Sequence, residues 1–256
     1  MATIQIRHWR HATLTITMGG HKLLVDPMFM PKGSMPAIPL TPNGSRNPLT
    51  DLPFSGKGLL RELKSIDGVL VTHTHFDHWD RAAIRLLSKK LPIFCQPCNS
   101  KKIEKSGFQN VFPIETDAEW QGFTFTRTSG QHGTGFVGRL MGKVSGFIIK
   151  QKNTSVYIAG DTVYSPKIET ILQVHQPDIV IINAGSAQFL KGGPITFDGK
   201  DVISLAKAQP ESQIVAVHME AINHCTLSRD NLKQNLEFHK LVERVLIPKD
   251  GDLLNL

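Results

Sequence analysis

The chain lacks the features that mark exported, membrane-spanning or disulfide-stabilised proteins. Its 256 residues include only three cysteines and two tyrosines, too few cysteines for a disulfide framework. No apolar run approaches the roughly 18 residues that a membrane-spanning helix requires. The first 17 residues alternate polar and apolar side chains and carry Arg7 and Arg10 where a signal peptide would be apolar. These absences predict a cytoplasmic protein without a membrane span.

The chain is basic overall, but its lysine and arginine residues form no separate cluster. Lysine and arginine number 29 against 22 acidic residues, a formal net charge of +7. Such a balance is compatible with nucleic-acid binding, but the basic residues are scattered and form no separate arm. Pairs such as Lys89 and Lys90 fall on or beside predicted helices, where charge runs are usually solvated. Nucleic acid is therefore not the expected partner.

The only cysteine pair with metal-binding spacing has no counterpart. Cys95 and Cys98 form a C-x-x-C motif, whereas a zinc ribbon requires a second such pair and the remaining cysteine, Cys225, stands alone. We interpret the pair as two incidental thiols that follow a strand.

Short strands and helices alternate along a chain without internal repeats or linkers. Runs rich in β-branched and aromatic residues predict strands over 4–7, 13–18, 22–25, 69–72, 123–128, 145–150, 155–159, 179–182, 214–217 and 245–247. Helical patterns predict helices after Ser165 and over 81–89, 99–105, 199–208 and 229–243. This order predicts one α/β domain over residues 1–256, with mixed sheets flanked by helices. Residues 31–58 are rich in Pro, Gly, Asn and Ser and predict a long binding loop or lid.

Residues 73–78 form an H-x-H-x-D-H motif directly after a predicted buried strand. Its members are His73, His75, Asp77 and His78. Imidazole nitrogens and carboxylate oxygens bind borderline divalent cations, and catalytic zinc sites keep one position open for water. Strand ends in α/β proteins carry the chemistry, so these side chains are expected to converge on one or two adjacent points. The motif predicts a metal site.

Further ligands are expected where other strands end. His132, Asp161 and His218 each follow a predicted strand, and His224 comes six residues after His218. Each of three has an ordinary alternative: an exposed turn histidine for His132, a helix cap for Asp161, and a polar loop histidine for His224.

The order of these residues resembles the metallo-β-lactamase superfamily: H-x-H-x-D-H, a lone histidine, Gly-Asp after a strand, and a histidine after the last core strand. Residues 8–13 and 23–27 also resemble the branch that includes L-ascorbate-6-phosphate lactonase and N-acylphosphatidylethanolamine phospholipase D. The resemblance extends from about residue 3 to about residue 225. The motif is specific for the superfamily and says almost nothing about substrate.

The resemblance implies a four-layer αββα sandwich, in which two mixed β-sheets pack face to face with helices outside and the metals at one sheet edge. The implied ligands of the first metal are His73, His75 and His132; those of the second are Asp77, His78 and His218; and Asp161 bridges the two.

The last ligand is open between His218 and His224. His218 is preferred because it ends a strand, and His224 then becomes a substrate contact or proton donor. Asp26 and His11 match positions that would orient the ligands, although a plain Asp-Pro turn explains Asp26 equally well.

Two divalent cations held in this way lower the pKa of a shared water from 15.7 to about 7. The resulting hydroxide attacks a carbonyl carbon or phosphorus, and Asp77 orients it and moves its proton. The chain carries no G-x-S-x-G motif and no Walker loop, so the expected reaction is metal-dependent hydrolysis of an ester, lactone or phosphodiester. Nitrogen and oxygen ligands suit Zn²⁺ best and also accommodate Mn²⁺, Fe²⁺ or Ni²⁺.

The basic balance, with Arg139 and Lys143 after His132, favours a small-molecule or lipid-like anionic substrate. Two alternatives stay open: a mononuclear iron redox enzyme on the same fold, and a nucleic-acid-processing metallo-hydrolase. The sequence does not give the oligomeric state.

Overall fold

The chain builds two seven-stranded mixed sheets, in a computed structural model that describes residues 4–256. The first sheet contains, in spatial order, β14 (Leu253–Asn255), β1 (Gln5–Arg10), β2 (Thr13–Met18), β3 (His21–Val25), β4 (Gly68–Val71), β5 (Pro92–Cys95) and β6 (Asn110–Pro113). The second contains β13 (Val245–Leu246), β12 (Gln213–Val217), β11 (Ile179–Asn183), β10 (Thr154–Ile158), β9 (Ser145–Gln151), β8 (Phe123–Ser129) and β7 (Asp117–Trp120). Strands β3 to β6 and β10 to β13 pair in parallel, and the others pair antiparallel.

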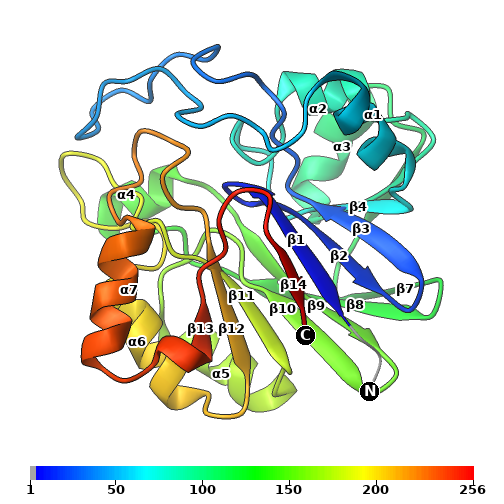
Figure 1. The fold of residues 1–256 in the computed structure, drawn as a ribbon. Coiled ribbons are helices and arrows are strands. Elements are labelled where there is room, and N and C mark those ends of the chain that lie inside the picture. Colours follow the sequence, from blue (N-terminus) through cyan, green and yellow to red (C-terminus); the bar gives the residue numbers. More distant parts are fainter. Residues whose placement is uncertain (1–3) are drawn as a thin grey trace.

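Helices lie on both outer faces of the pair of sheets (Figure 1). Those of the described chain are α1 (Gly56–Lys64), α2 (Arg81–Leu86), α3 (Pro97–Lys105), α4 (Gly135–Leu140), α5 (Pro166–His175), α6 (Gly199–Ala208) and α7 (Arg229–Phe238), with a 3₁₀ turn at Val242–Arg244. The apolar faces of α1, α2 and α3 pack on the first sheet, and those of α5, α6 and α7 pack on the second. The four-layer αββα prediction is confirmed.

The central core lies between the two sheets because successive side chains of a strand point to opposite faces. In β4, Leu70 enters the core shared by the sheets, whereas Val69 and Val71 pack under the helices. In β8, Phe123 and Phe125 enter the shared core. Both faces of the central strands are therefore buried, so in the sequence they are the short runs of β-branched and aromatic residues from which most core strands are predicted.

Several predicted boundaries are wrong. The last long helix ends at Phe238 rather than Glu243, and the helix that begins at Arg81 ends at Leu86 rather than Lys89. Helices α1 and α4 and strands β6, β7 and β14 have no sequence prediction, and the strand expected before the cysteine pair is β5, in which Cys95 is the last residue rather than a residue after the strand. Helix α1 begins at Gly56, so the long loop ends at Ser55, three residues earlier than expected. Within residues 4–256, no helix is long and apolar enough to cross a membrane.

Candidate metal centre

The predicted ligands come from turns that follow four different strands. The H-x-H-x-D-H turn follows β4, and His132, Asp161 and His218 follow β8, β10 and β12. The His75 carbonyl accepts hydrogen bonds from the backbone N–H groups of His78 and Trp79, which folds the motif into a tight turn. In Figure 1 the segment between β3 and α1 crosses the upper end of the molecule, above α4.

The structure brings all seven predicted ligands together. Their donor atoms form three overlapping groups in which every ligand atom lies within 4.8 Å of the others. The groups are His73, His75 and His132; His11, Asp77, His78 and His218; and His73, His78 and Asp161. His11, expected only to orient a ligand, lies inside the second group. His224 belongs to none of these groups of described residues.

The carboxylate of Asp161 lies between the first two groups. Its Oδ2 atom is 3.7 Å from His73 Nε2, 3.5 Å from His132 Nε2 and 3.3 Å from His78 Nε2. Its Oδ1 atom is 3.3 Å from His218 Nε2. One carboxylate thus faces histidines of both groups, as a bridging ligand must.

Burial and charge place Asp77, Asp161, His73 and His218 in the protonation states that bind cations. Burial alone would raise the pKa of Asp161 and Asp77, but the neighbouring charge of His78 outweighs it and holds both pKa values well below the usual range. Burial lowers the pKa of His73 and His218 well below the usual value, which leaves these imidazoles neutral. Ionised carboxylates and neutral imidazoles are the ligand forms of divalent metals, so the donor set fits such a cation. His78 differs: burial alone would lower its pKa, but the carboxylates of Asp161, Asp26 and Asp77 outweigh burial and raise that pKa well above the usual value, so a bound cation would have to displace a proton from this ring.

Three residues of the site have a strained backbone. His11, Asp26 and His218 have φ angles of 57°, 43° and 70°, in the left-handed region that favours glycine. The strain persists because contacts fix it: the His218 N–H donates to the His11 carbonyl at 3.0 Å, and the two rings lie 3.5 Å apart. Such strain clusters at functional sites, where surrounding structure maintains it.

Asp26 holds both the H-x-H-x-D-H turn and one of its histidines. Its Oδ1 atom accepts the Thr72 N–H at 2.7 Å, and its Oδ2 atom accepts the Thr72 hydroxyl at 2.7 Å and lies 2.8 Å from His78 Nδ1. With Nδ1 engaged, His78 presents Nε2 to the cluster. A buried carboxylate behind a ligating histidine fixes the ring orientation, so the structure favours the orienting role for Asp26.

Two contacts of the ligands have no sequence prediction. Asn183 donates from Nδ2 to Asp161 Oδ1 at 2.6 Å, and Cys225 Sγ lies 3.6 Å from His218 Nδ1. Asn183 is the last residue of β11, and a polar residue at the carboxyl end of a core strand is a sequence feature that could have marked it as part of the site. Cys225 carried no such signal, because its contact depends on the path of the loop after β12.

A cavity of about 170 Å³ opens onto the cluster. Its lining residues are Ile38, His75, Phe76, Asp77, His132, Met141, Asp161, Phe189, Ile195 and His224. His224 Nδ1 is buried and has no hydrogen-bond partner within the described residues, and burial lowers the pKa of His224 to about 4. The ring is therefore neutral at pH 7, and it has a free polar atom beside the cavity.

Asn223 ties the segment between β3 and α1 to the site. Its Oδ1 accepts the Ile38 N–H at 3.0 Å and the Asn47 Nδ2 group at 2.8 Å, and its Nδ2 donates to Thr41 Oγ1 at 2.7 Å. Ile38 lines the cavity, so the predicted binding loop does reach the candidate site. This buried side chain thus ties the segment that carries Ile38 to the loop that carries His224.

Replacing Asn223 by alanine is expected to loosen this segment without removing a ligand. Several backbone and side-chain partners lose hydrogen bonds worth about 1 kcal/mol each. Limited proteolysis within residues 31–55 should accelerate at least tenfold, while metal content stays that of the parent. Asn110→Ala, which removes one exposed side-chain bond to the Lys90 carbonyl, is the control. Equal cleavage rates in both variants would contradict this role of Asn223.

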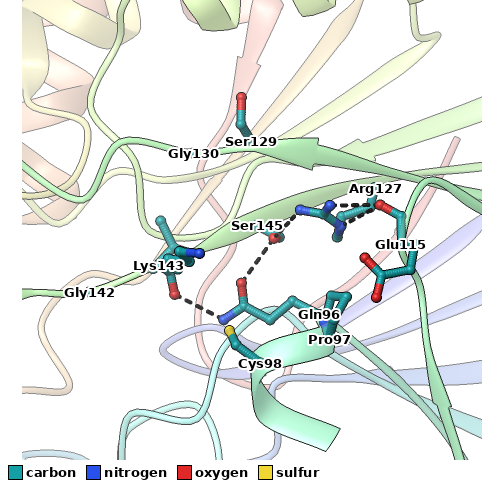
Figure 2. Close-up of a pocket in the computed structure, with 11 residues that line it drawn as sticks. Gln96, Pro97, Cys98, Glu115, Arg127, Ser129, Gly130, Gly142, Lys143 and Ser145 are labelled. Carbon is teal, nitrogen blue, oxygen red and sulfur yellow. Dashed lines mark hydrogen bonds between the residues drawn. The ribbon is translucent and has the colours of Figure 1, made fainter.

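The cations expected to attract an anionic substrate lie away from this cavity. Arg139 is on α4, and Lys143 lines a second cavity of about 380 Å³. Figure 2 shows that cavity, where Gln96 donates to the Lys143 carbonyl and Arg127 donates to the Glu115 carbonyl. No lysine or arginine is among the described residues that line the metal cavity.

The C-x-x-C motif is also outside the cluster. Cys95 is buried in β5 and Cys98 is exposed on α3. Neither belongs to a metal-donor group of residues 4–256, and their interpretation as incidental thiols stays a prediction.

Fold and donor set together define a metal-dependent hydrolase of the metallo-β-lactamase fold. The model of the beta-lactamase superfamily domain matches residues 21–219. The UPF0173 protein YddR of Bacillus subtilis is 37% identical over 97% of this chain and 98% of its own length. The chain belongs to the UPF0173 group of the beta-lactamase superfamily.

Two crystal structures have the same fold over almost the whole chain. A possible metal-dependent hydrolase from Veillonella parvula is 35% identical with a TM-score of 0.94, covering 98% of this chain and 99% of that one. The isothiocyanate hydrolase from Delia radicum gut bacteria is 33% identical with a TM-score of 0.91, covering 98% of each chain.

Proposed function

We propose that this protein is a dinuclear hydrolase that adds water to a small, uncharged electrophilic carbon, as in an isothiocyanate, an ester or a lactone. The observation that carries the proposal is the Asp161 carboxylate: its Oδ2 atom lies within 3.7 Å of the Nε2 atoms of His73, His132 and His78, and its Oδ1 atom lies 3.3 Å from His218 Nε2. One donor group alone would bind a single ion. Two groups that share a carboxylate support two.

The ligand assignment is part of the proposal. His73, His75 and His132 hold one ion, and Asp77, His78 and His218 hold the other. Asp161 bridges them, and Zn²⁺ fits this nitrogen and oxygen donor set. A divalent cation bound there would lower the pKa of a water molecule toward 7 and supply hydroxide at neutral pH.

Two side chains at the cavity are placed to assist. Asp77 is ionised, and its Oδ2 lies 3.1 Å from His11 Nε2, which fixes the carboxylate where it can orient the attacking water and accept its proton. His224 is neutral and places an imidazole beside the cavity. A hydrogen bond from this ring would stabilise negative charge that develops on the substrate.

We infer the substrate class from the apolar lining of the cavity and from the similarity to one structurally characterised hydrolase. Apolar side chains dominate the lining outside the ligands, and the described residues there include no cation. This lining favours an uncharged substrate over an anionic one. The isothiocyanate hydrolase with a TM-score of 0.91 makes an isothiocyanate the first substrate to test. Its hydrolysis consumes one water and releases a primary amine and carbonyl sulfide.

Elemental analysis combined with a substrate panel tests the proposal. The panel contains 2-phenylethyl isothiocyanate, an aryl ester, a lactone, an aryl phosphodiester and a β-lactam. We expect two divalent ions per chain and amine release from the isothiocyanate. A single iron per chain, with no hydrolysis of any member, would instead favour the redox alternative. Turnover of the phosphodiester alone would overturn the uncharged-carbon assignment.

Replacing His224 by glutamine separates substrate contact from metal binding. The expected result is a kcat about 100-fold lower, because a positioned proton donor or hydrogen bond contributes on that order. Metal content should remain that of the parent, because His224 lies outside the three donor groups. His239→Gln, on the surface after α7, is the matched control. Loss of one metal ion in the His224 variant would show that His224, not the assigned histidine, is a ligand.

A further inference from the structure

An apolar groove of about 470 Å³ lies beside the metal cavity. Its lining residues are Leu40, Phe136, Val137, Leu140, Met141, Phe189, Leu190 and Lys191. They come from the segment between β3 and α1, from α4 and the residue after it, and from the loop after β11. Lys191 is the only charged residue among the described residues of this lining.

The groove exposes large apolar side chains to solvent. Leu40 and Phe136 are each 74% exposed, Leu140 is 64% exposed and Leu190 is 65% exposed. Clustered exposure of this kind marks a binding surface rather than ordinary scatter. Its volume falls in the range of pockets that hold small organic molecules.

The groove is continuous with the candidate active site. Met141 and Phe189 line both the groove and the metal cavity. Ile38 lines the cavity and Leu40 lines the groove, two residues apart on the same segment. The Leu190 N–H donates to the Leu40 carbonyl at 2.8 Å, which joins two walls of the groove. A molecule with its reacting carbon at the metal centre can therefore extend into the groove.

We propose that the groove binds the apolar substituent of the substrate, an alkyl or arylalkyl chain attached to the reacting group. The inference rests on the proposed function and names its substrate class more narrowly. The metal cavity of about 170 Å³ holds the reacting group alone, and the neighbouring groove supplies apolar surface for the rest. Lys191 is exposed, and the other described residues of the lining are uncharged.

A series of straight-chain isothiocyanates, from methyl to hexyl, tests the groove. Each methylene that enters the groove should raise kcat/KM about three- to fourfold, because the transfer free energy of one buried methylene corresponds to a factor of that size. In the double variant Phe136→Ser and Leu140→Ser, the ratio of kcat/KM for hexyl to that for methyl should fall at least tenfold. Phe238→Ser, a change at an 84% exposed residue of α7, should leave the ratio unchanged.

A binding measurement separates this inference from the proposed function. The apolar fluorescent probe N-phenyl-1-naphthylamine requires no turnover. We expect the parent to bind it, the double variant to bind at least tenfold more weakly, and hexylamine to displace it. If no isothiocyanate is hydrolysed, the substrate proposal fails while the probe still tests the groove. Equal probe binding by parent and double variant overturns the groove assignment. The groove assignment is also overturned if the parent protein is a dimer and the double variant is a monomer, because a second copy of the chain would then occupy the groove.

Discussion

Replacing Asp161 by alanine is expected to reduce bound metal from the proposed two ions to fewer than one per chain and to lower hydrolysis at least about 100-fold. Changes to residues behind a ligand already cost about 10- to 100-fold in metal affinity or activity, and Asp161 is itself the proposed shared ligand. Its loss leaves both donor groups without the carboxylate between them. Four imidazoles then face one another with less negative charge to balance a cation.

Metal analysis by mass spectrometry of the purified variant measures this result. Asp161→Asn has nearly the same shape and keeps an oxygen, so it separates loss of charge from collapse of the site. It should also bind fewer than two ions. Asp230→Asn, on the exposed first turn of α7, is the control and should keep the parent metal content. Two tightly bound ions in Asp161→Ala would show that the bridging assignment is wrong.

The core strands were predictable because their signal is local. The central strands of both sheets are buried on one face by the other sheet and on the opposite face by helices, so each is a short run of β-branched and aromatic residues. The edge strands lack such an apolar run. In β6 and β7 the residues are exposed or only half buried, so no apolar pattern marks them. Helix α4 has no buried residue, and a helix without a buried face leaves no periodic signal.

The candidate metal ligands, whose convergence in space the sequence predicts, have a different signal. Four of them lie within six residues of sequence, and the rest lie one to three residues after a strand. Supports such as Thr72 and Asn183 were not predicted, because their roles depend on which strand ends become neighbours in space. The groove depends on three segments that are distant in sequence. A single sequence carries no pattern that joins them.

His11 shows how such a spatial contact modifies a local prediction. The sequence places it in a support position, but its ring lies 3.5 Å from that of His218 and its Nε2 atom lies 3.1 Å from Asp77 Oδ2. The left-handed backbone at both histidines permits this approach. His11 therefore holds Asp77 and belongs to the same group of donor atoms.

Replacing Asp26 by alanine is expected to destabilise the metal-free protein by about 3 kcal/mol, because three buried donors lose their acceptor at about 1 kcal/mol each or more. These donors are the Thr72 N–H, the Thr72 hydroxyl and the Nδ1–H group of His78. Metal affinity should also fall by about 10- to 100-fold, since the His78 ring loses the group that fixes its orientation. Urea unfolding of the chelated protein measures the first effect, and titration with Zn²⁺ measures the second.

The comparison with Asp67 decides between a positioning carboxylate and a generic turn aspartate. Asp67 also accepts a backbone N–H, that of Lys22 at 2.8 Å, but its side chain is 44% exposed. Water replaces a lost partner at an exposed site, so Asp67→Ala should cost less than about 1 kcal/mol and leave zinc affinity unchanged. If Asp26 were only part of an Asp-Pro turn, its variant would lose stability with unchanged zinc affinity. A fall in both quantities in the Asp26 variant, and in neither in the Asp67 variant, identifies Asp26 as the residue that orients His78 toward the metal.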